Sequence, residues 1–414
     1  MRSSSPWHAF RWRQWWLRVF VGLAVTGLVV GCGGAPIRNA LPDTLSGQAA
    51  ASGMTGVRFW GDQTPPNLKA IVKEKIAQMR AARPHLFKAG KRPLLSFLTV
   101  SGGGSDGAFG AGLLTGWSAS GTRPEFEIVT GVSTGALIAP FAFLGPKYDP
   151  VLKEMYTTYS TDAFLRKRPV QGLLGGTALA SNKPLAGLIA KYADQNLLAE
   201  VAAAHKTGRR LLIGTTNLDA QRPVIWDMGK IASSGNPEAI HLFRNVLLAS
   251  AAIPGVFPPV FINVQADGKT YDEMHVDGGT TNQVFLLPGQ LRVGSVDNRT
   301  GFHPQRREYI IRNGRVGPEH KVVTAGTLSI ASRSVSTLIK YQGIGDLYKM
   351  YEFSRRNGIQ YRLAYIPVDF KDTSTETFDT VYMTKLFDVG YRQAKQGYRW
   401  KKTPPGSGTP RARR

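Results

Sequence analysis

Short apolar runs separated by Gly-rich turns and amphipathic stretches predict alternating strands and helices along most of the chain. The run LLSFLTV at 94–100 is typical of a buried strand, and a second strand is expected at 126–130. Each is followed by a Gly-rich turn and a helix of small or apolar residues, the second helix at 136–144. Because this order requires crossover connections, it predicts a parallel sheet with helices on both faces.

The rest of the pattern continues the same architecture without an internal repeat or a second domain boundary. Further strands are expected at 210–215, 224–227, 274–276, 309–312 and 361–367, and further helices from 64 to about 79 and at 184–203, 324–340, 343–356 and 379–396. We therefore predict one α/β domain over residues 91–400, preceded by a tether and N-terminal extension at 32–90. The Pro/Gly-rich and basic end, 401–414, is expected to be a flexible tail.

The N-terminus has the layout of an export signal. Four arginines and no acidic residue precede Cys32, and the run at 19–30 is uncharged and almost wholly apolar. As a helix this run would be about 18 Å long, which is short of a bilayer core of roughly 30 Å. A charged region followed by a short apolar region is typical of a secretory signal, which takes no part in the fold.

The end of this run resembles the bacterial lipoprotein signal. Residues 28–32 read LVVGC, in which small residues precede Cys32. The resemblance implies a signal peptide at 1–31, lipidation of Cys32, and a cell-envelope protein anchored by lipid; the absence of Asp at position 33 resembles outer-membrane sorting. The small, polar residues at 33–56 then predict a tether. The alternative is a weak membrane anchor with a buried cysteine.

Charge and cysteine content narrow the classes of partner. The 414 residues include 52 Lys and Arg against 28 Asp and Glu, which gives a net charge of +24. This charge favours binding to an anionic partner such as lipid or nucleic acid. The export signal favours lipid, so no nucleic-acid partner is expected. A single cysteine excludes an intrachain disulfide and zinc sites of the CxxC type, and no HExxH motif is present.

Two turns match GxSxG, at 103–107 and 131–135, and they offer two candidate nucleophiles. A nucleophile elbow requires the serine directly after a strand and at the start of a helix. Ser133 meets this requirement, and the helix N-terminus favours negative charge there. Ser105 lies five residues beyond its strand within a Gly run. We therefore predict Ser133 as the nucleophile.

The glycines of the first turn suit a different task. Backbone N–H groups of Gly102, Gly103 and Gly104 could stabilise the oxyanion of acyl transfer, because glycine has no Cβ to obstruct the approach. The same segment fits the dinucleotide pattern GxGxxG, which predicts an acidic residue at the end of the second strand. That strand instead ends in Thr130-Gly131. The dinucleotide interpretation is therefore disfavoured.

A serine nucleophile requires a proton acceptor, for which the sequence offers two candidates. Asp277 ends a short strand before Gly278-Gly279, which would point its carboxylate out of the same sheet edge as Ser133. His275 lies two residues before it. Asp277 would act directly on a serine only if it were desolvated and tightly positioned. An ordinary Asp-Gly turn is the alternative for this motif.

Taken together, these blocks resemble the patatin-like phospholipase family. The turn SGGGSDGAFGAG at 101–112, the elbow GVSTG at 131–135 and the DGG at 277–279 stand in the family's order, with the family-like ASAAIPGVFPP at 249–259 between them. The resemblance implies a three-layer α/β/α sandwich around a mainly parallel sheet. It also implies a Ser133–Asp277 dyad, an oxyanion hole around Gly102–Gly104, and no metal or cofactor. The 249–259 stretch is expected to pack the aspartate strand.

Two positions depart from the family pattern. The family's turn commonly begins with Asp and carries an Arg before its last Gly, where this chain has Ser101 and Asp106. Loss of the Arg puts a preference for phospholipid in doubt more than acyl hydrolysis itself. The leading hypothesis is a membrane-anchored lipid acyl hydrolase acting on a lipid or acyl ester. The alternatives are an esterase with a Ser–His–Asp triad, using His275 or another histidine, and an inert lipid-binding envelope lipoprotein.

Overall fold

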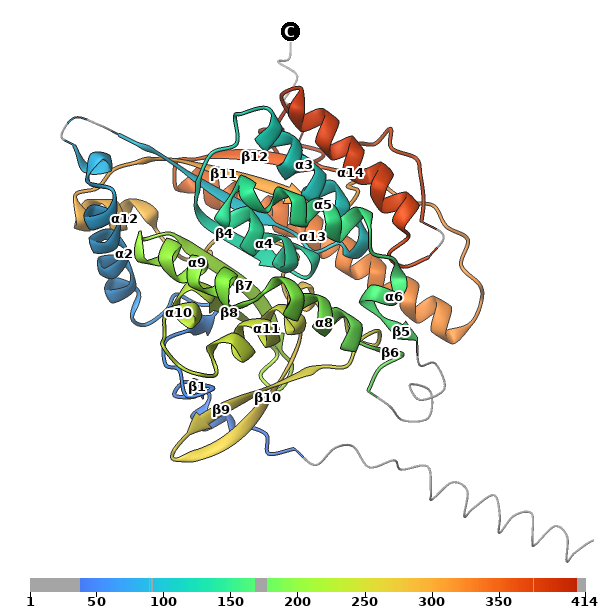
Figure 1. The fold of residues 1–414 in the computed structure, drawn as a ribbon, viewed down its shortest axis with the longest axis horizontal. Coiled ribbons are helices and arrows are strands. Elements are labelled where there is room, and N and C mark those ends of the chain that lie inside the picture. The colour runs from blue at the N-terminus through green and yellow to red at the C-terminus, as the bar shows by residue number, and fades with distance from the viewer. Residues whose placement is uncertain (1–37, 89, 91, 168–176, 375, 408–414) are drawn as a thin grey trace, which may run out of the picture.

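Five parallel strands, which begin at one edge of the sheet, form one part of a mixed sheet. The computed structural model describes residues 38–88, 90, 92–167, 177–374 and 376–407. In spatial order the parallel strands are β12 (Ile359–Tyr365), β11 (Gln305–Arg312), β3 (Leu94–Val100), β4 (Phe126–Val132) and β7 (Arg210–Asn217) (Figure 1). The parallel sheet predicted from the strand–helix alternation is confirmed.

Beyond β7 the sheet continues with antiparallel strands. These are β8 (Arg222–Asp227), β10 (Lys269–Asp277), β9 (Val260–Ala266) and β1 (Ala50–Ala51), with β2 (Arg58–Trp60) paired to β8. The sequence indicated only residues 274–276 of the β9–β10 hairpin. Its turn is Asp267-Gly268, where both residues have positive φ, as tight hairpin turns between twisted strands require.

Helices cover both faces of the sheet, as the resemblance implied. One face carries α3 (Gly107–Ala119), α4 (Thr134–Leu144), α5 (Asp149–Thr157), α6 (Thr161–Phe164), α8 (Lys183–Tyr192), α9 (Gln195–Lys206), α10 (Met228–Ala232), α11 (Ala239–Ser250) and α14 (Thr380–Lys395). The other carries α2 (Leu68–Ala82), α12 (Val293–Thr300) and α13 (Thr327–Arg356). Each face has its own buried cluster, so the fold is a three-layer α/β/α sandwich.

Smaller elements complete the described chain. Strands β5 (Arg166–Lys167) and β6 (Ala180–Ser181) form a separate ribbon. Short 3-10 turns occur at Asp43–Leu45, Pro84–Phe87, Gly104–Asp106, Pro146–Tyr148 and Gly278–Thr280. Among the residues that the structure describes, no helix has the length and apolar character needed to cross a bilayer.

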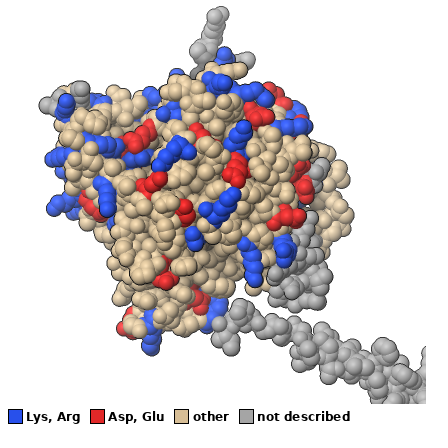
Figure 2. All heavy atoms as spheres, viewed as in Figure 1, with Lys and Arg blue, Asp and Glu red and all other residues tan. Residues whose placement is uncertain are grey.

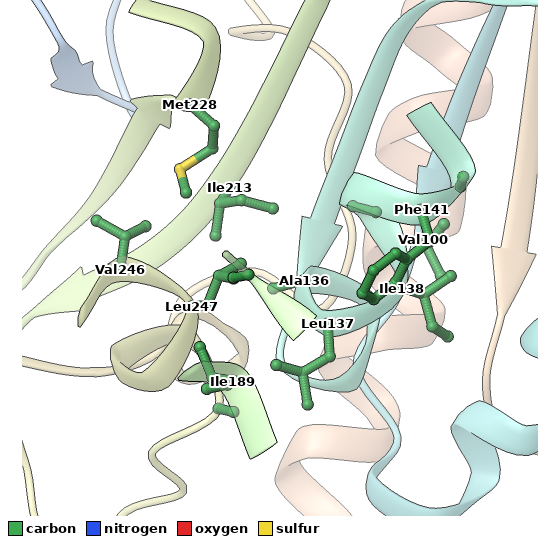
Figure 3. Close-up of a cluster of buried hydrophobic side chains, with 14 of the residues drawn as sticks. Val100, Ala136, Leu137, Ile138, Phe141, Ile189, Ile213, Met228, Val246 and Leu247 are labelled. Carbon is green, nitrogen blue, oxygen red and sulfur yellow. The ribbon is translucent and has the colours of Figure 1, made fainter. Parts of the chain in front are cut away.

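Helix α4, which begins directly after Ser133, is apolar on every side and lies within the core. Ala136 and Leu137 of α4 share a buried cluster with Ile213 of β7 and Leu247 of α11 (Figure 3). A helix that is hydrophobic all round is held by packing on every side. The element that carries the candidate nucleophile is therefore fixed within the core.

Two helix predictions differ from the structure. The stretch 184–203 is divided into α8 and α9, because the Asp194 side chain accepts a hydrogen bond from the Leu197 N–H at 2.8 Å and starts a new helix. Conversely, 324–340 and 343–356 belong to the single helix α13, which runs through Gly343. That glycine lies against the Arg312 side chain, where a Cβ would come within 2.9 Å of the guanidinium carbon.

Helices α3 and α14 cross at backbone distance. A Cβ on Gly112 would lie 2.0 Å from the Phe387 carbonyl oxygen, and one on Gly116 would lie 2.2 Å from that of Tyr391. The small residues of α3 are therefore a packing surface for α14. This crossing supports the helix that follows the Gly-rich turn.

Both ends of the described chain are attached to the sheet. Arg38 pairs with Asp219 and Asp272, and β1 pairs with β9, so the segment predicted as a tether is folded from Arg38 onward. At the other end Lys401 bridges to Leu363, so the tail predicted from 401 begins docked. A segment of small, polar residues can pair with the edge of a sheet through its backbone without burying large side chains. Its composition alone therefore does not distinguish it from a tether. Cys32, the signal peptide and residues 408–414 lie outside the described residues.

Candidate active site

The register of three strands brings Ser133 and Asp277 together. Strand β4 runs parallel to β7 and ends with Val132 opposite Gly214. Strand β10 runs antiparallel to β7 and ends with Asp277 opposite Thr215, the next residue of β7. The two strands therefore meet end to end along β7, and the residue after β4 is Ser133. This topology places the predicted nucleophile beside the predicted base.

Ser133 sits in a strained turn between β4 and α4. Its backbone has φ 54° and ψ −126°, a conformation that L residues rarely adopt. Such strained residues are found mainly at functional sites. The flanking glycines make the turn possible: a Cβ on Gly131 would lie 2.4 Å from the Gly135 carbonyl oxygen, and one on Gly135 would lie 2.2 Å from that of Val100. The geometry is that of a nucleophile elbow.

The stretch before the aspartate strand holds both partners in place. The Ser133 N–H donates to the Ser250 hydroxyl at 3.0 Å, and that hydroxyl donates to the Gly214 carbonyl at 2.7 Å. The Asp277 N–H donates to the Ala252 carbonyl at 2.9 Å. The sequence predicted only packing for this stretch, so it missed Ser250. The side chain is buried, and its partner is 117 residues away in the chain.

The Asp277 carboxyl has the electrostatics of a general base near neutral pH. Burial raises its pKa to about 7, and the Ser133 hydroxyl and the Gly279 N–H lower the pKa and so partly oppose this rise. The Gly279 N–H donates to Oδ1 at 2.7 Å, whereas Oδ2 has no hydrogen-bond partner among the described residues. The Ser133 hydroxyl is thus near the carboxylate without forming a hydrogen bond of normal geometry, which is common before substrate binds.

The Gly-rich turn presents two free N–H groups. The Gly102 N–H donates to the Gln283 carbonyl at 3.2 Å, so it is engaged. Those of Gly103 and Gly104 donate to no described residue. Gly103 admits no side chain, because a Cβ there would lie 2.0 Å from the Asn313 carbonyl oxygen, and Gly104 has φ 58°. Of the three predicted oxyanion donors, Gly103 and Gly104 are the available ones.

Two residues at the end of β11, which the sequence analysis missed, shape this turn. Nη1 of Arg312 lies 3.5 Å from the Gly102 carbonyl oxygen and 3.3 Å from the Ser101 hydroxyl, which itself donates to that carbonyl at 2.7 Å. Asn313 Nδ2 donates to the Ser101 carbonyl at 2.9 Å. In a trans peptide the C=O and the following N–H point in opposite directions. Holding the Gly102 carbonyl therefore fixes the direction of the Gly103 N–H.

Arg312 also brings a positive charge to the turn. The side chain is buried, and no Asp or Glu of the described chain lies within ion-pair distance of it. Asp106, where the family commonly has Arg, instead accepts a hydrogen bond from the Tyr382 hydroxyl of α14 at 2.6 Å. Burial raises the pKa of Asp106 to about 6. The cation at this turn thus comes from β11 rather than from the turn itself.

His275 is engaged away from Ser133. Its Nδ1 lies 3.0 Å from the Thr215 hydroxyl and its Nε2 lies 3.1 Å from Glu273 Oε2. Burial lowers the pKa of the imidazole. Both ring nitrogens therefore have partners within the sheet. The other described histidines show no hydrogen bond to Ser133 or Asp277; they are His85, His205, His241, His303 and His320.

Comparison with protein families gives a match over part of this chain. The family model described as patatin-like phospholipase matches residues 98–288, a span that contains Ser133, Asp277 and the Gly-rich turn. No curated protein matches the chain.

Among solved structures, VipD from Legionella pneumophila is 12% identical, with a TM-score of 0.32 over 73% of this chain and 67% of VipD. A chain of the complex of ExoU with SpcU from Pseudomonas aeruginosa is 12% identical, with a TM-score of 0.28 over 74% and 52%. Human GIVD cytosolic phospholipase A2 is 9% identical, with a TM-score of 0.29 over 79% and 56%. This chain spans about half the length of the last two. The family match, rather than these distant likenesses, carries the assignment. Residues 98–288 of this chain form a domain of the patatin-like phospholipase family.

Proposed function

We propose that this protein is a membrane-anchored lipid acyl hydrolase that cleaves acyl esters with Ser133 and Asp277. The family match implies a lipid acyl hydrolase. The observation that carries the finer proposal is the end-to-end meeting of β4 and β10 on β7, which places a strained serine beside a buried carboxyl whose pKa is about 7.

The reaction follows from these groups. Ser133 Oγ attacks the ester carbonyl carbon while Asp277 takes the hydroxyl proton. The tetrahedral intermediate collapses, its bond to the alcohol oxygen breaks, and Asp277 returns the proton to the leaving alcohol. Water then attacks the acyl-enzyme with Asp277 again as base, which releases the fatty acid and restores Ser133.

The Gly-rich turn stabilises the charge that develops on the carbonyl oxygen. The free N–H groups of Gly103 and Gly104 are the donors, and Arg312 fixes the first of them through the Gly102 carbonyl. Donors that are oriented before the reaction need no reorganisation in the transition state. The nearby guanidinium adds a favourable potential for an anion.

Two features support a lipid substrate at a membrane. The N-terminal signal favours lipidation at Cys32 and a place in the bacterial cell envelope, at the outer membrane. The excess of Lys and Arg favours attraction to anionic lipid, and Figure 2 shows the positive side chains spread over the visible face with fewer acidic ones among them. Nucleic acid is not a partner in this proposal.

The alternatives differ in what they require. A Ser–His–Asp triad would require His275 to leave both of its present partners, or another histidine to reach Ser133. An inert lipid-binding lipoprotein was favoured by the missing turn arginine. Arg312 weakens that argument because it supplies a cation from β11.

Hydrolysis of short- and long-chain nitrophenyl esters by the native chain, Ser133→Ala, Asp277→Asn and His275→Gln tests the proposal. We expect both dyad variants to lose at least 10³-fold in kcat with folding intact, and His275→Gln to keep most of its activity. Full loss in His275→Gln, with folding retained, would favour the triad. No activity in the native chain, with detergent or anionic vesicles present, would favour the inert lipoprotein.

A further inference from the structure

The N-terminal half of α13 is a helix almost without a core contact. From residue 327 to residue 342 no described side chain is fully buried, and the first buried position of the helix is Gly343. Residues 327–338 extend about 18 Å at 1.5 Å per residue. Figure 1 shows this end of α13 (orange) at the periphery of the molecule. Packing against a partner would stabilise this segment, because a helix of this length gains little stability in water without it.

The outward side of this segment is apolar where a solvent-facing helix is normally polar. Ile330, Leu338 and Tyr341 are 53%, 70% and 65% exposed, and Tyr348 continues the same row. Positions 330, 334, 338, 341, 345 and 348 are three or four residues apart, so they lie on one side of the helix. Ser334 and Gly345, the remaining members of the row, are small. We call these six positions the α13 stripe.

Most of the charge around the α13 stripe is positive. Residues 320–345 contain no Asp or Glu and include Lys321, Arg333 and Lys340. Glu319 pairs with Lys340, and Asp346 is buried. The loop before the helix adds Val322, which is 84% exposed. Apolar side chains flanked by cations match the chemistry of an anionic lipid surface, in which the apolar groups enter the head-group boundary and the cations meet phosphates.

The α13 stripe belongs to the helix that supports the Gly-rich turn of the candidate active site. Two residues beyond Tyr341, Gly343 packs against the guanidinium of Arg312, which holds the Gly-rich turn. The connection from Asn313 back to α13 is fixed on the helix, because Lys340 Nζ donates to Glu319 Oε2 at 2.6 Å. Gly343 lies about 180° around the helix from the middle of the stripe, so a surface that receives the stripe would contact the side of α13 opposite Arg312.

We propose that the α13 stripe inserts into the head-group region of an anionic lipid surface. This inference rests on the proposed function, because an acyl hydrolase of membrane lipid must meet its substrate at such a surface. It adds a second contact to the N-terminal anchor: the anchor tethers the chain, and the stripe orients it.

A local probe tests the insertion independently of the anchor. Because Cys32 is the only cysteine, the full chain with Cys32→Ser and Leu338→Cys can carry one environment-sensitive fluorophore at the stripe. Cys32→Ser with Leu94→Cys is the matched control. Leu94 is 42% exposed and begins β3, so it lies at the end of the parallel strands opposite to the candidate active site. With phosphatidylglycerol-containing vesicles we expect a blue shift and quenching by brominated lipid at position 338 and neither at 94.

The second experiment measures the affinity of variants for vesicles. In the Cys32→Ser chain, Ile330→Ser with Leu338→Ser should weaken binding to phosphatidylglycerol-containing vesicles at least tenfold, whereas Leu94→Ser with Leu218→Ser should change it less than twofold. Lys321→Gln with Arg333→Gln should reduce the preference for phosphatidylglycerol over phosphatidylcholine about fivefold or more. All of these variants should hydrolyse a soluble short-chain ester at the native rate.

Three outcomes would overturn the inference. The first is a vesicle-bound chain without a spectral shift at position 338. The second is equal loss of affinity in the two apolar double variants. The third is a shift at position 338 that appears without vesicles as protein concentration rises, which would assign the stripe to a second copy of the chain. Failure of the proposed function would instead appear as a native chain that does not hydrolyse the soluble ester.

Discussion

At the residue scale, the site depends on one carboxyl whose charge is disfavoured by its surroundings. Burial raises the pKa of Asp277 to about 7, and a general base works best when its pKa is near the working pH. We therefore expect kcat/KM for a soluble ester to rise about tenfold per pH unit below pH 7 and to level off above it. A pH–rate profile checks this. A profile that is flat between pH 5 and pH 8 would contradict Asp277 as the base.

The same pKa shift has a signature in stability. A carboxyl whose pKa is raised by folding destabilises the folded state increasingly as pH rises from its ordinary value, about 4, to its folded value, about 7. Asp277→Asn removes this penalty. Relative to the native chain, the variant should gain up to about 4 kcal/mol in free energy of unfolding between pH 4 and pH 8. Urea unfolding at several pH values measures the gain, and a constant difference would contradict the shift.

Arg312 provides a test of how the Gly-rich turn is oriented. Because its guanidinium reaches the Gly102 carbonyl, Arg312→Met should lower kcat for a soluble ester by about 10- to 100-fold and change KM less than about twofold. Arg312→Lys should recover part of the loss. Kinetics together with thermal unfolding of both variants check this. A folded Arg312→Met variant with native kcat would contradict the positioning role.

At the scale of elements, the site is held by close approaches between helices. Gly112→Ala would place a methyl group 2.0 Å from the Phe387 carbonyl and force α3 away from α14. We expect a loss of about 1–3 kcal/mol in free energy of unfolding. Gly187→Ala is the control, because nothing lies within 4 Å of its Cβ position within α8, and alanine should stabilise that helix by about 0.5–1 kcal/mol. Equal effects of the two substitutions would contradict the close crossing.

Elements whose signal is local could be predicted from the sequence, whereas contacts between distant segments could not. Strand β3 was predicted at its observed bounds, and Ser133 was singled out because its strand, turn and helix are contiguous. Ser250 and Arg312 were missed because each acts on a residue more than 100 positions away, and no periodicity reveals such a pairing. Strand β9 was missed although its alternation of buried and exposed positions is typical of a half-buried strand.

At the scale of the whole molecule, we propose that lipidation of Cys32 attaches the protein to the membrane. Cys32→Ser should move the protein from the membrane fraction to the soluble fraction of lysed cells and abolish incorporation of labelled palmitate. Several acyl chains give durable attachment, since each buried CH₂ contributes about 0.8 kcal/mol. A chain that incorporates no palmitate in its native form would contradict lipidation.

In the proposed mechanism one serine and one aspartate, brought together by the meeting of β4 and β10, perform acyl transfer. Labelling with a fluorophosphonate, followed by mapping of the adduct by mass spectrometry, tests it most directly. We expect a single adduct on Ser133, formed at least 100-fold more slowly in Asp277→Asn and absent in Ser133→Ala. An adduct on Ser105 or any other residue, or unchanged labelling in Asp277→Asn, would contradict the mechanism.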